Sequence, residues 1–211
     1  MYRNQYDSDV TTFAPTGKLH QVEYAMNAVN QGSACCGLRS KNAVVLVANK
    51  EGGQADDLSE HTEKIFAIDK HIGIVVAGLV ADARYLSKWM INECLNHSWA
   101  FETPINSGRL VTALADKSQV YTQKSEKRPY GVGLLVAGID KTGPHLYQTD
   151  PSGDFFEFEA NAMGNRSQSA RTYLEKNFEA FPDCSVDGSA PLNTSFSCFL
   201  VLGRGVFFVR L

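Results

Sequence analysis

Short strand-like segments constrain the fold of this chain most, because they occur in groups with only a few polar residues between neighbours. The groups are SACCGLR with AVVLVAN, KIFAI with IGIVVAG, VGLLVAGID with HLYQTD and FFEFEA, and SFSCFLVLG with GVFFVRL. Connections this short join antiparallel strands, whereas parallel strands need crossovers of roughly a dozen residues. We therefore expect antiparallel hairpins. AVVLVAN is apolar almost throughout, which predicts a strand covered on both faces.

Apolar residues three and four positions apart predict helical segments between these groups. The stripes are Leu19, Val22, Met26 and Val29; Ala83, Leu86, Met90 and Cys94; Leu110, Ala113 and Leu114; and Ala170, Leu174, Phe178 and Phe181. The first stripe predicts a helix over residues 16–32, with Thr16 as N-cap and Gly32 as a left-handed stop. The last helix is expected to start near Ser167.

Blocks of antiparallel strands separated by helices do not fit a βαβ alternation. They indicate two stacked sheets with helices on the outer faces, which is a layered α+β fold. The chain has no internal repeat and no linker, so we expect one domain over residues 1–211. Within it, residues 1–15 form an arm, 16–32 the first helix and 33–211 the layered body.

Composition excludes several classes of partner. The net charge is −3 and no run of five like charges occurs, so neither nucleic acid nor an anionic membrane is expected as a partner. The apolar runs are too short to span a bilayer. The N-terminus lacks the apolar region of a secretion signal.

The cysteines and histidines predict neither a disulfide framework nor a metal site. The five cysteines are an odd number without a CxxC pair, and the five histidines are scattered. Buried free thiols in a reducing compartment fit this pattern better. Adjacent Cys35 and Cys36 are expected to point to opposite faces of one strand. No metal or other cofactor is expected.

Three further motifs have ordinary structural explanations. The glycines of GVGLLVAG lie inside an apolar strand, so close strand packing is favoured over a phosphate loop. Arg166 and Arg171 could hold an anion at a helix start, but a solvated helix is favoured. The acidic stretch from Asp56 to Glu63 is expected to be wet surface. These residues by themselves leave the function open.

The N-terminal stretch YDSDVTTFAPTGKLHQVEYAMNAVNQGS resembles the signature of α-type subunits of the 20S proteasome. That signature runs from Tyr-Asp through an aromatic-x-Pro-x-Gly turn to a helix with Gln-Val-Glu-Tyr-Ala, ending before Gly-Ser. EKIFAID, HIGIVVAGLVADAR, RPYGVGLLVAGID, GPHLYQTDPSG and GNRSQSARTYLE follow in the family's order. The resemblance covers most of residues 2–181, and within the family it favours one paralogue.

The resemblance implies the fold of N-terminal nucleophile hydrolases, a four-layer αββα sandwich of two antiparallel sheets between helix layers. It further implies a non-catalytic structural and gating subunit for ubiquitin-dependent protein degradation. Its partners would be other α subunits in a seven-membered ring, β-ring subunits, and the regulatory particle or other activators. The expected location is the cytoplasm and nucleus.

The resemblance also argues against catalysis by this chain. Catalytic relatives use an N-terminal threonine whose hydroxyl attacks the peptide while its free amine serves as the base. Ser33 takes that position here, but its nitrogen lies inside a peptide bond. Asn49 replaces the supporting carboxylate, and Lys64 matches the active-site lysine. The alternative is a self-processing hydrolase that cleaves itself before Ser33, Cys35 or Cys36.

Two sets of site residues follow from the resemblance. Tyr6, Asp7, Pro15 and Tyr24 match the gate cluster that holds the N-terminal arms open, with Pro15 fixing the turn that aims the arm. Simple packing of Tyr24 under the arm remains the alternative. Lys64, Gly32 and Leu79 match the pocket for activator C-termini, where an ammonium can pair with a terminal carboxylate.

The chain departs from the family pattern near its end. The family continues after ARTYLE with a further helix, whereas FPDCSVDGSAPLNTSFSCF leaves no room for a full one. The usual charged C-terminal tail is absent after FFVRL. Two explanations follow: the outer helix layer is truncated, or part of the sequence is missing from this chain.

Overall fold

The computed structural model describes residues 6–49, 63–179, 198–202 and 206–209. The elements, in chain order, are α1 (His20–Gln31), β1 (Cys35–Arg39), β2 (Val44–Ala48), β3 (Ile65–Asp69), β4 (Ile72–Gly78), α2 (Val80–Phe101), α3 (Ser107–Gln123), β5 (Val132–Asp140), β6 (Gly143–Thr149), β7 (Phe155–Glu157), β8 (Ala160–Met163), α4 (Ser167–Lys176), β9 (Cys198–Leu202) and β10 (Val206–Val209). The predicted order of strands and helices is therefore confirmed.

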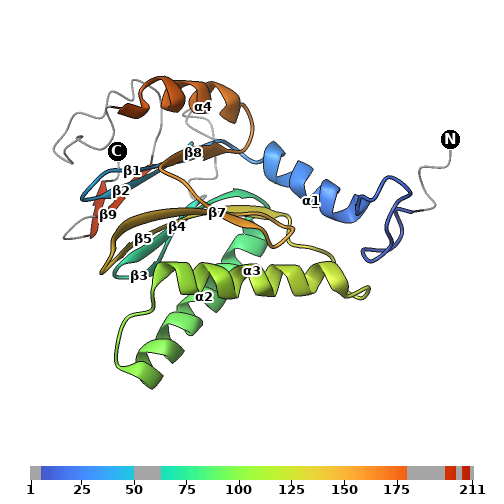
Figure 1. Ribbon diagram of the computed structural model, residues 1–211, viewed down its shortest axis with the longest axis horizontal. Helices are drawn as coiled ribbons and strands as arrows, with labels where there is room; N and C mark the ends of the chain where they lie inside the picture. Colours follow the sequence, from blue (N-terminus) through green and yellow to red (C-terminus); the bar gives the residue numbers. More distant parts are fainter. Residues whose placement is uncertain (1–5, 50–62, 180–197, 203–205, 210–211) are drawn as a thin grey trace, which may run out of the picture.

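The described strands form two antiparallel sheets, which lie one above the other in Figure 1. Sheet A has the order β10-β9-β2-β1-β8, and sheet B has the order β3-β4-β5-β6-β7. The predicted hairpins β1–β2, β3–β4, β5–β6 and β9–β10 all pair as expected. The strands of sheet B pair in chain order, with α2 and α3 inserted between β4 and β5. In sheet A, by contrast, β8 and β9 come from late in the chain and pair with β1 and β2.

Apolar side chains fill three separate layers. Leu46 of sheet A packs with Val75 and Leu135 of sheet B in the layer between the sheets. The outer face of sheet B packs on α2 and α3, and the outer face of sheet A packs on α4 through Leu174. The order α4, sheet A, sheet B, α2 with α3 is visible in Figure 1. The α+β, four-layer sandwich expected for N-terminal nucleophile hydrolases is thus confirmed.

The segment FFEFEA is divided between the two sheets, contrary to the single strand that its sequence predicts. β7 ends at Glu157 and pairs with β6, whereas β8 begins at Ala160 and pairs with β1. Between them, the Phe158 amide donates to the Leu146 carbonyl at 2.8 Å in sheet B. The Glu159 carbonyl accepts from the Arg39 amide at 2.7 Å in sheet A. Backbone bonding in both sheets thus explains the division.

The predicted start of the first helix is wrong, whereas its predicted stop is right in position, since Gly32 is the C-cap after Gln31, but wrong in conformation. Helix α1 begins at His20, and its N-cap Leu19 makes no side-chain cap. Thr16 lies instead in a turn closed by the Gly17 amide and the Ala14 carbonyl, so it cannot cap a helix. Gly32 has φ −61° and ψ 152°, which is extended and not left-handed. The chain leaves the helix directly into the approach to β1.

Helix α4 is shorter than its apolar stripe predicts. It ends at Lys176, so Phe178 lies beyond the helix, and Phe181 falls outside the described residues. The stretch in which a truncated outer helix is expected also lies outside them. Across the described part of the chain, no helix combines the length and apolar character needed to cross a bilayer.

The three cysteines whose side chains the structure describes, Cys35, Cys36 and Cys94, are buried thiols. Cys35 packs between the sheets and Cys36 packs toward α4, which confirms that they face opposite sides of β1. Burial raises the pKa of Cys36 to about 11 and that of Cys94 to about 12. None of these three forms a disulfide, and among the described residues no group of His, Cys, Asp and Glu could hold a metal ion.

Candidate functional site

A tight turn joins the N-terminal arm to helix α1. The Gly17 amide donates to the Ala14 carbonyl at 2.8 Å, and the Ala14 amide donates to the Lys18 carbonyl at 2.9 Å. Pro15 is the second residue of this turn, where its fixed φ is favoured. Gly17 has φ +79°, a conformation that glycine adopts without steric cost. Pro15 is exposed, so it acts through the backbone direction of the turn.

Two side chains of α1 hold the arm against the helix. Tyr24 donates its hydroxyl to Asp7 Oδ2 at 2.7 Å. Gln21 donates Nε2 to the Asp7 carbonyl at 2.5 Å. Residues three positions apart share a helix face, so both side chains reach the same arm residue. Sequence reasoning identified Tyr24 but missed Gln21, although Gln21 belongs to the Gln-Val-Glu-Tyr-Ala motif.

The predicted gate residues lie on the arm, on the turn that follows it and on the first part of α1. Asp7 and Tyr24 are in direct contact, and Tyr6 precedes Asp7 and is half-buried. Tyr24 is 46% exposed, so part of its ring faces away from the arm. Lys18, next to the Pro15 turn, forms an ion pair with Glu23 of α1 at 3.0 Å. The turn and the arm are therefore both tied to the first two turns of α1.

Gly32 and Leu79 meet where α1 ends. A Cβ on Gly32 would lie 2.2 Å from the Gly78 nitrogen, so the two backbones touch. Leu79 follows Gly78 directly, donates its amide to the Gly131 carbonyl at 2.9 Å and is 48% exposed. The close approach of the two backbones therefore requires a glycine at position 32.

Lys64 lies one strand away from this contact. Its carbonyl accepts from the Val76 amide at 3.1 Å, just outside the β3–β4 ladder. Val76 precedes Gly78 by two residues, which is about 7 Å along a strand. The three predicted pocket residues thus come from the end of α1, the start of β3 and the β4–α2 junction, all at one end of sheet B.

An ion pair that the sequence did not predict supports the Leu79 side of this region. Arg128 donates Nη1 to Asp82 Oδ2 at 2.6 Å and Nη2 to Oδ1 at 2.8 Å. The Gly131 amide donates to Asp82 Oδ2 at 3.0 Å. These hydrogen bonds hold the pKa of Asp82 below its usual value. The RPYG and ADAR segments contain the pair, but spacing gives no sign that they meet.

Ser33 lies in a setting unsuited to a nucleophile. It is 5% exposed, and its hydroxyl has no hydrogen-bond partner among the described residues. A Cβ on Gly164 would lie 2.7 Å from the Ser33 carbonyl oxygen, so that backbone covers it. Asn49 bonds through its backbone amide to the Ala34 carbonyl at 2.9 Å. The Ser33 nitrogen is a peptide amide, which cannot accept a proton as a terminal amine does.

Two family models match consecutive parts of the chain. Residues 6–28 match the N-terminal signature of the A-type subunits of the proteasome. Residues 29–190 match the proteasome subunit family. The boundary between the two models lies within α1, three residues before the helix ends.

Relatives match over nearly all of the chain. The alpha type-1 proteasome subunit of Dictyostelium discoideum is 54% identical over 187 residues, which is 89% of this chain and 75% of the relative. The type-1 subunit of Drosophila melanogaster is also 54% identical over 187 residues, covering 89% and 66%. That of Trypanosoma brucei rhodesiense is 44% identical over 226 residues, covering 100% and 85%.

The segments RNQYDSDVTTF, RPYGVGLLVAG and RSQSARTYLE predicted a likeness to the alpha type-1 paralogue, and these relatives confirm it. The chain spans from 66% to 85% of the length of these three relatives. The N-terminal signature falls on the arm and the start of α1, and the longer match falls on the layered body. The chain therefore belongs to the proteasome subunit family, as one of its α-type members.

Proposed function

We propose that the chain is a non-catalytic structural and gating subunit in the α ring of the 20S proteasome. The observation that carries the proposal is the anchoring of the N-terminal arm on α1 by the 2.7 Å hydrogen bond from Tyr24 to Asp7. An arm fixed at its base has a defined direction, which is the requirement for a gate. The proposed complex is a seven-membered α ring stacked on β rings, in the cytoplasm and nucleus.

The surroundings of Ser33 support a non-catalytic role. Its hydroxyl is buried, its nitrogen is an amide, and Asn49 supplies no carboxylate. The N-terminal threonine mechanism needs a free amine as base and an accessible hydroxyl as nucleophile. The arm and α1 precede Ser33 covalently, so the same segment that would control entry also prevents this chain from acting as the protease.

The end of α1 supports docking of an activator. Lys64 offers an ammonium group and Leu79 an exposed apolar side chain, while Gly32 lets the end of α1 pack directly on the backbone that precedes Leu79. A C-terminal carboxylate with a preceding apolar residue matches the ammonium group and the apolar side chain. The proposed ligand is the C-terminus of the regulatory particle or another activator, with a neighbouring α subunit forming the other wall.

The gating role can be tested in 20S particles that carry Tyr24→Phe in this subunit. The loss of one hydrogen bond, about 1 kcal/mol, corresponds to a shift of about fivefold in the gate equilibrium. We expect activator-stimulated hydrolysis of a fluorogenic peptide to fall by up to that factor. Tyr173→Phe on α4 is the matched control, and it should leave activator-stimulated hydrolysis unchanged. An unchanged response to activators in Tyr24→Phe particles would contradict the gating role.

Intact-mass measurement of the subunit from native particles tests the non-catalytic role. The proposal expects a chain that retains the arm and α1. A mature chain beginning at Ser33, Cys35 or Cys36 would instead establish the alternative, a self-processing hydrolase. The two experiments fail independently, because a chain can be unprocessed and still have no influence on the gate.

A further inference from the structure

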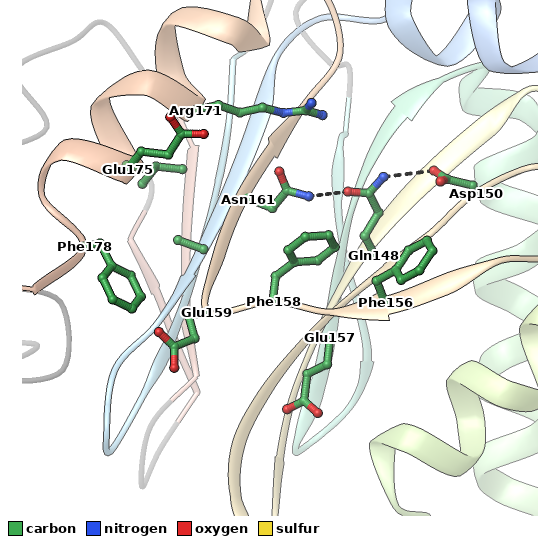
Figure 2. A pocket seen from close by; sticks show the side chains of 12 residues that line it. Gln148, Asp150, Phe156, Glu157, Phe158, Glu159, Asn161, Arg171, Glu175 and Phe178 are labelled. Atoms are coloured by element: carbon green, nitrogen blue, oxygen red, sulfur yellow. Dashed lines mark hydrogen bonds between the residues drawn. The ribbon is translucent and has the colours of Figure 1, made fainter.

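A groove of about 750 Å³ lies between α4 and the crossing from β7 to β8. Figure 2 shows it from close by, with α4 on one side and the side chains of β6, β7 and β8 on the other. It involves none of the arm, pocket or Ser33 residues. An inference about it therefore stands apart from the proposed function.

Aromatic side chains give the groove an apolar surface. Phe156 of β7 is 55% exposed and Phe178, just beyond α4, is 49% exposed. Phe158 packs against the core between the sheets, and Leu174 of α4 is buried against sheet A. Two large aromatic side chains left half in water on facing walls form an apolar surface that a partner can cover.

Acidic side chains surround this apolar surface. Four carboxylates line the groove, those of Asp150, Glu157, Glu159 and Glu175, against the one guanidinium of Arg171. The formal charge of the lining is therefore −3. Arg39 pairs with Glu157 at 2.8 Å and with Glu159 at 3.4 Å, which leaves −2 when it is included. Within the described residues, the Glu175 carboxylate has no ion pair.

A hydrogen-bonded row fixes the floor of the groove. Asn161 donates Nδ2 to Gln148 Oε1, and Gln148 donates Nε2 to Asp150 Oδ1 at 2.9 Å, as Figure 2 shows. Asn161 also accepts from the Ala162 amide at 2.8 Å. Side chains locked in this way lose little freedom when a ligand binds, so the groove is preorganised.

The two strands beside the groove differ in their free edges. β7 is the last strand of sheet B, so one of its edges has no neighbouring strand among the described residues. β8 is the last strand of sheet A, but Arg171 donates Nε to the Ala162 carbonyl at 2.7 Å and occupies that edge. An extended chain can thus pair along β7 but is hindered along β8.

We propose that the groove binds an extended segment of a partner protein in which cationic and apolar side chains alternate. Lysine or arginine side chains would face Glu157, Glu159 and Glu175, while the apolar side chains cover Phe156 and Phe178. An anionic ligand is disfavoured by the lining charge. A second copy of this chain is disfavoured because it carries the same net negative charge, −3.

Fluorescence anisotropy with the chain of residues 1–211 and three labelled octapeptides tests this proposal. The peptides are KLKFKLKF, its acidic counterpart ELEFELEF, and KSKGKSKG, which keeps the charge without the apolar side chains. We expect KLKFKLKF to bind at least tenfold more tightly than either of the others. Equal binding of the first and third peptides would reduce the groove to a non-specific acidic surface and would overturn the proposal.

Paired variants locate the binding. Glu175→Lys and Phe156→Ser should each weaken KLKFKLKF at least fivefold. Glu126→Lys in the α3–β5 loop makes the same charge change elsewhere, and Phe13→Ser removes an exposed phenylalanine of the N-terminal arm, outside the groove. Both controls should bind as the unchanged chain does. Binding that is insensitive to the groove variants, or absent altogether, would refute the proposal. If no peptide bound and analytical ultracentrifugation showed a dimer, the occupant of the groove would instead be a second copy of the chain.

Discussion

The two parts of the proposed site are held in different ways. The arm is fixed to α1 by side-chain hydrogen bonds and an ion pair, and most of the groups involved are exposed to solvent. The region around Gly32 and Leu79 is fixed by contact between backbones and by an ion pair on a nearly buried carboxylate. Exposed side-chain bonds are weak and exchange readily, whereas packed backbones have no alternative arrangement. The difference indicates an adjustable arm beside a rigid pocket.

The largest effect is expected from Gly32→Ala. The new Cβ would lie 2.2 Å from the Gly78 nitrogen and 2.9 Å from its Cα, and both are backbone atoms that cannot rotate away. We expect a loss of roughly 3 kcal/mol in the free energy of unfolding, from overpacking. Urea denaturation of the chain of residues 1–211 measures this loss.

Gly17→Ala is the matched control for that change. Apart from the adjacent residues, no atom lies within 4 Å of the Cβ position of Gly17, but its φ of +79° is unfavourable for alanine. It should cost only about 1 kcal/mol. Equal losses in the two variants would mean that the α1–β4 contact is no more rigid than the turn.

The second effect concerns Asp82→Asn and depends on pH. The folded pKa of Asp82 is lowered by hydrogen bonds from Arg128 and Gly131. The Asp82 carboxylate therefore contributes to the free energy of unfolding above its unfolded pKa of about 4. This contribution disappears as the pH falls through the lower folded pKa. The Arg128 side chain is 62% exposed, so screening limits the loss in the variant to about 1–2 kcal/mol at pH 7.

Urea denaturation at pH 7 and pH 3 measures this pH dependence. The stability difference between the unchanged chain and Asp82→Asn should shrink at pH 3. Asp116→Asn, at an exposed position of α3, should show no such difference at either pH. A difference for Asp82→Asn that is independent of pH would show that shape, and not charge, holds the loop beside Leu79.

The smallest effect is expected from Gln21→Leu, which removes the donor to the Asp7 carbonyl. A hydrogen bond of this kind contributes about 0.5–1 kcal/mol, so amide hydrogens of residues 7–18 should exchange about two- to fivefold faster. The unfolding midpoint should hardly move. Gln168→Leu, at an exposed position of α4, is the control. Unchanged exchange in the arm would mean that Tyr24 and the Pro15 turn suffice to fix it.

The sequence predicts the elements well but not their exact ends. Apolar spacing gave the four hairpins and the four helices, because burial of one face repeats every two or three to four residues. It missed the division of FFEFEA, since that depends on backbone partners more than 100 residues earlier for β8. It missed the true start of α1 because a Pro-Gly turn takes precedence over a threonine cap at Thr16.

The candidate site shows the same limit. The family resemblance supplied Tyr6, Asp7, Pro15, Tyr24, Lys64, Gly32 and Leu79, and the structure places Asp7 against Tyr24 and Gly32 against the residue before Leu79. Gln21 and the Asp82–Arg128 pair were missed. Asp82 and Arg128 are 46 residues apart, and one sequence carries no information on which distant charges meet.

The pairing order of the strands also bears on how the chain is made. Every strand of sheet B lies between residues 65 and 157, so a ribosome has delivered all of it before β9 emerges. β2 lies between β1 and β9, so its bonds to residues 198–202 cannot form before those residues are made. Since parts of a domain can assemble as they become available during translation, sheet B with α2 and α3 can form early, while the edge of β2 that pairs with β9 waits for its partner. A nascent chain of this kind needs protection at that edge.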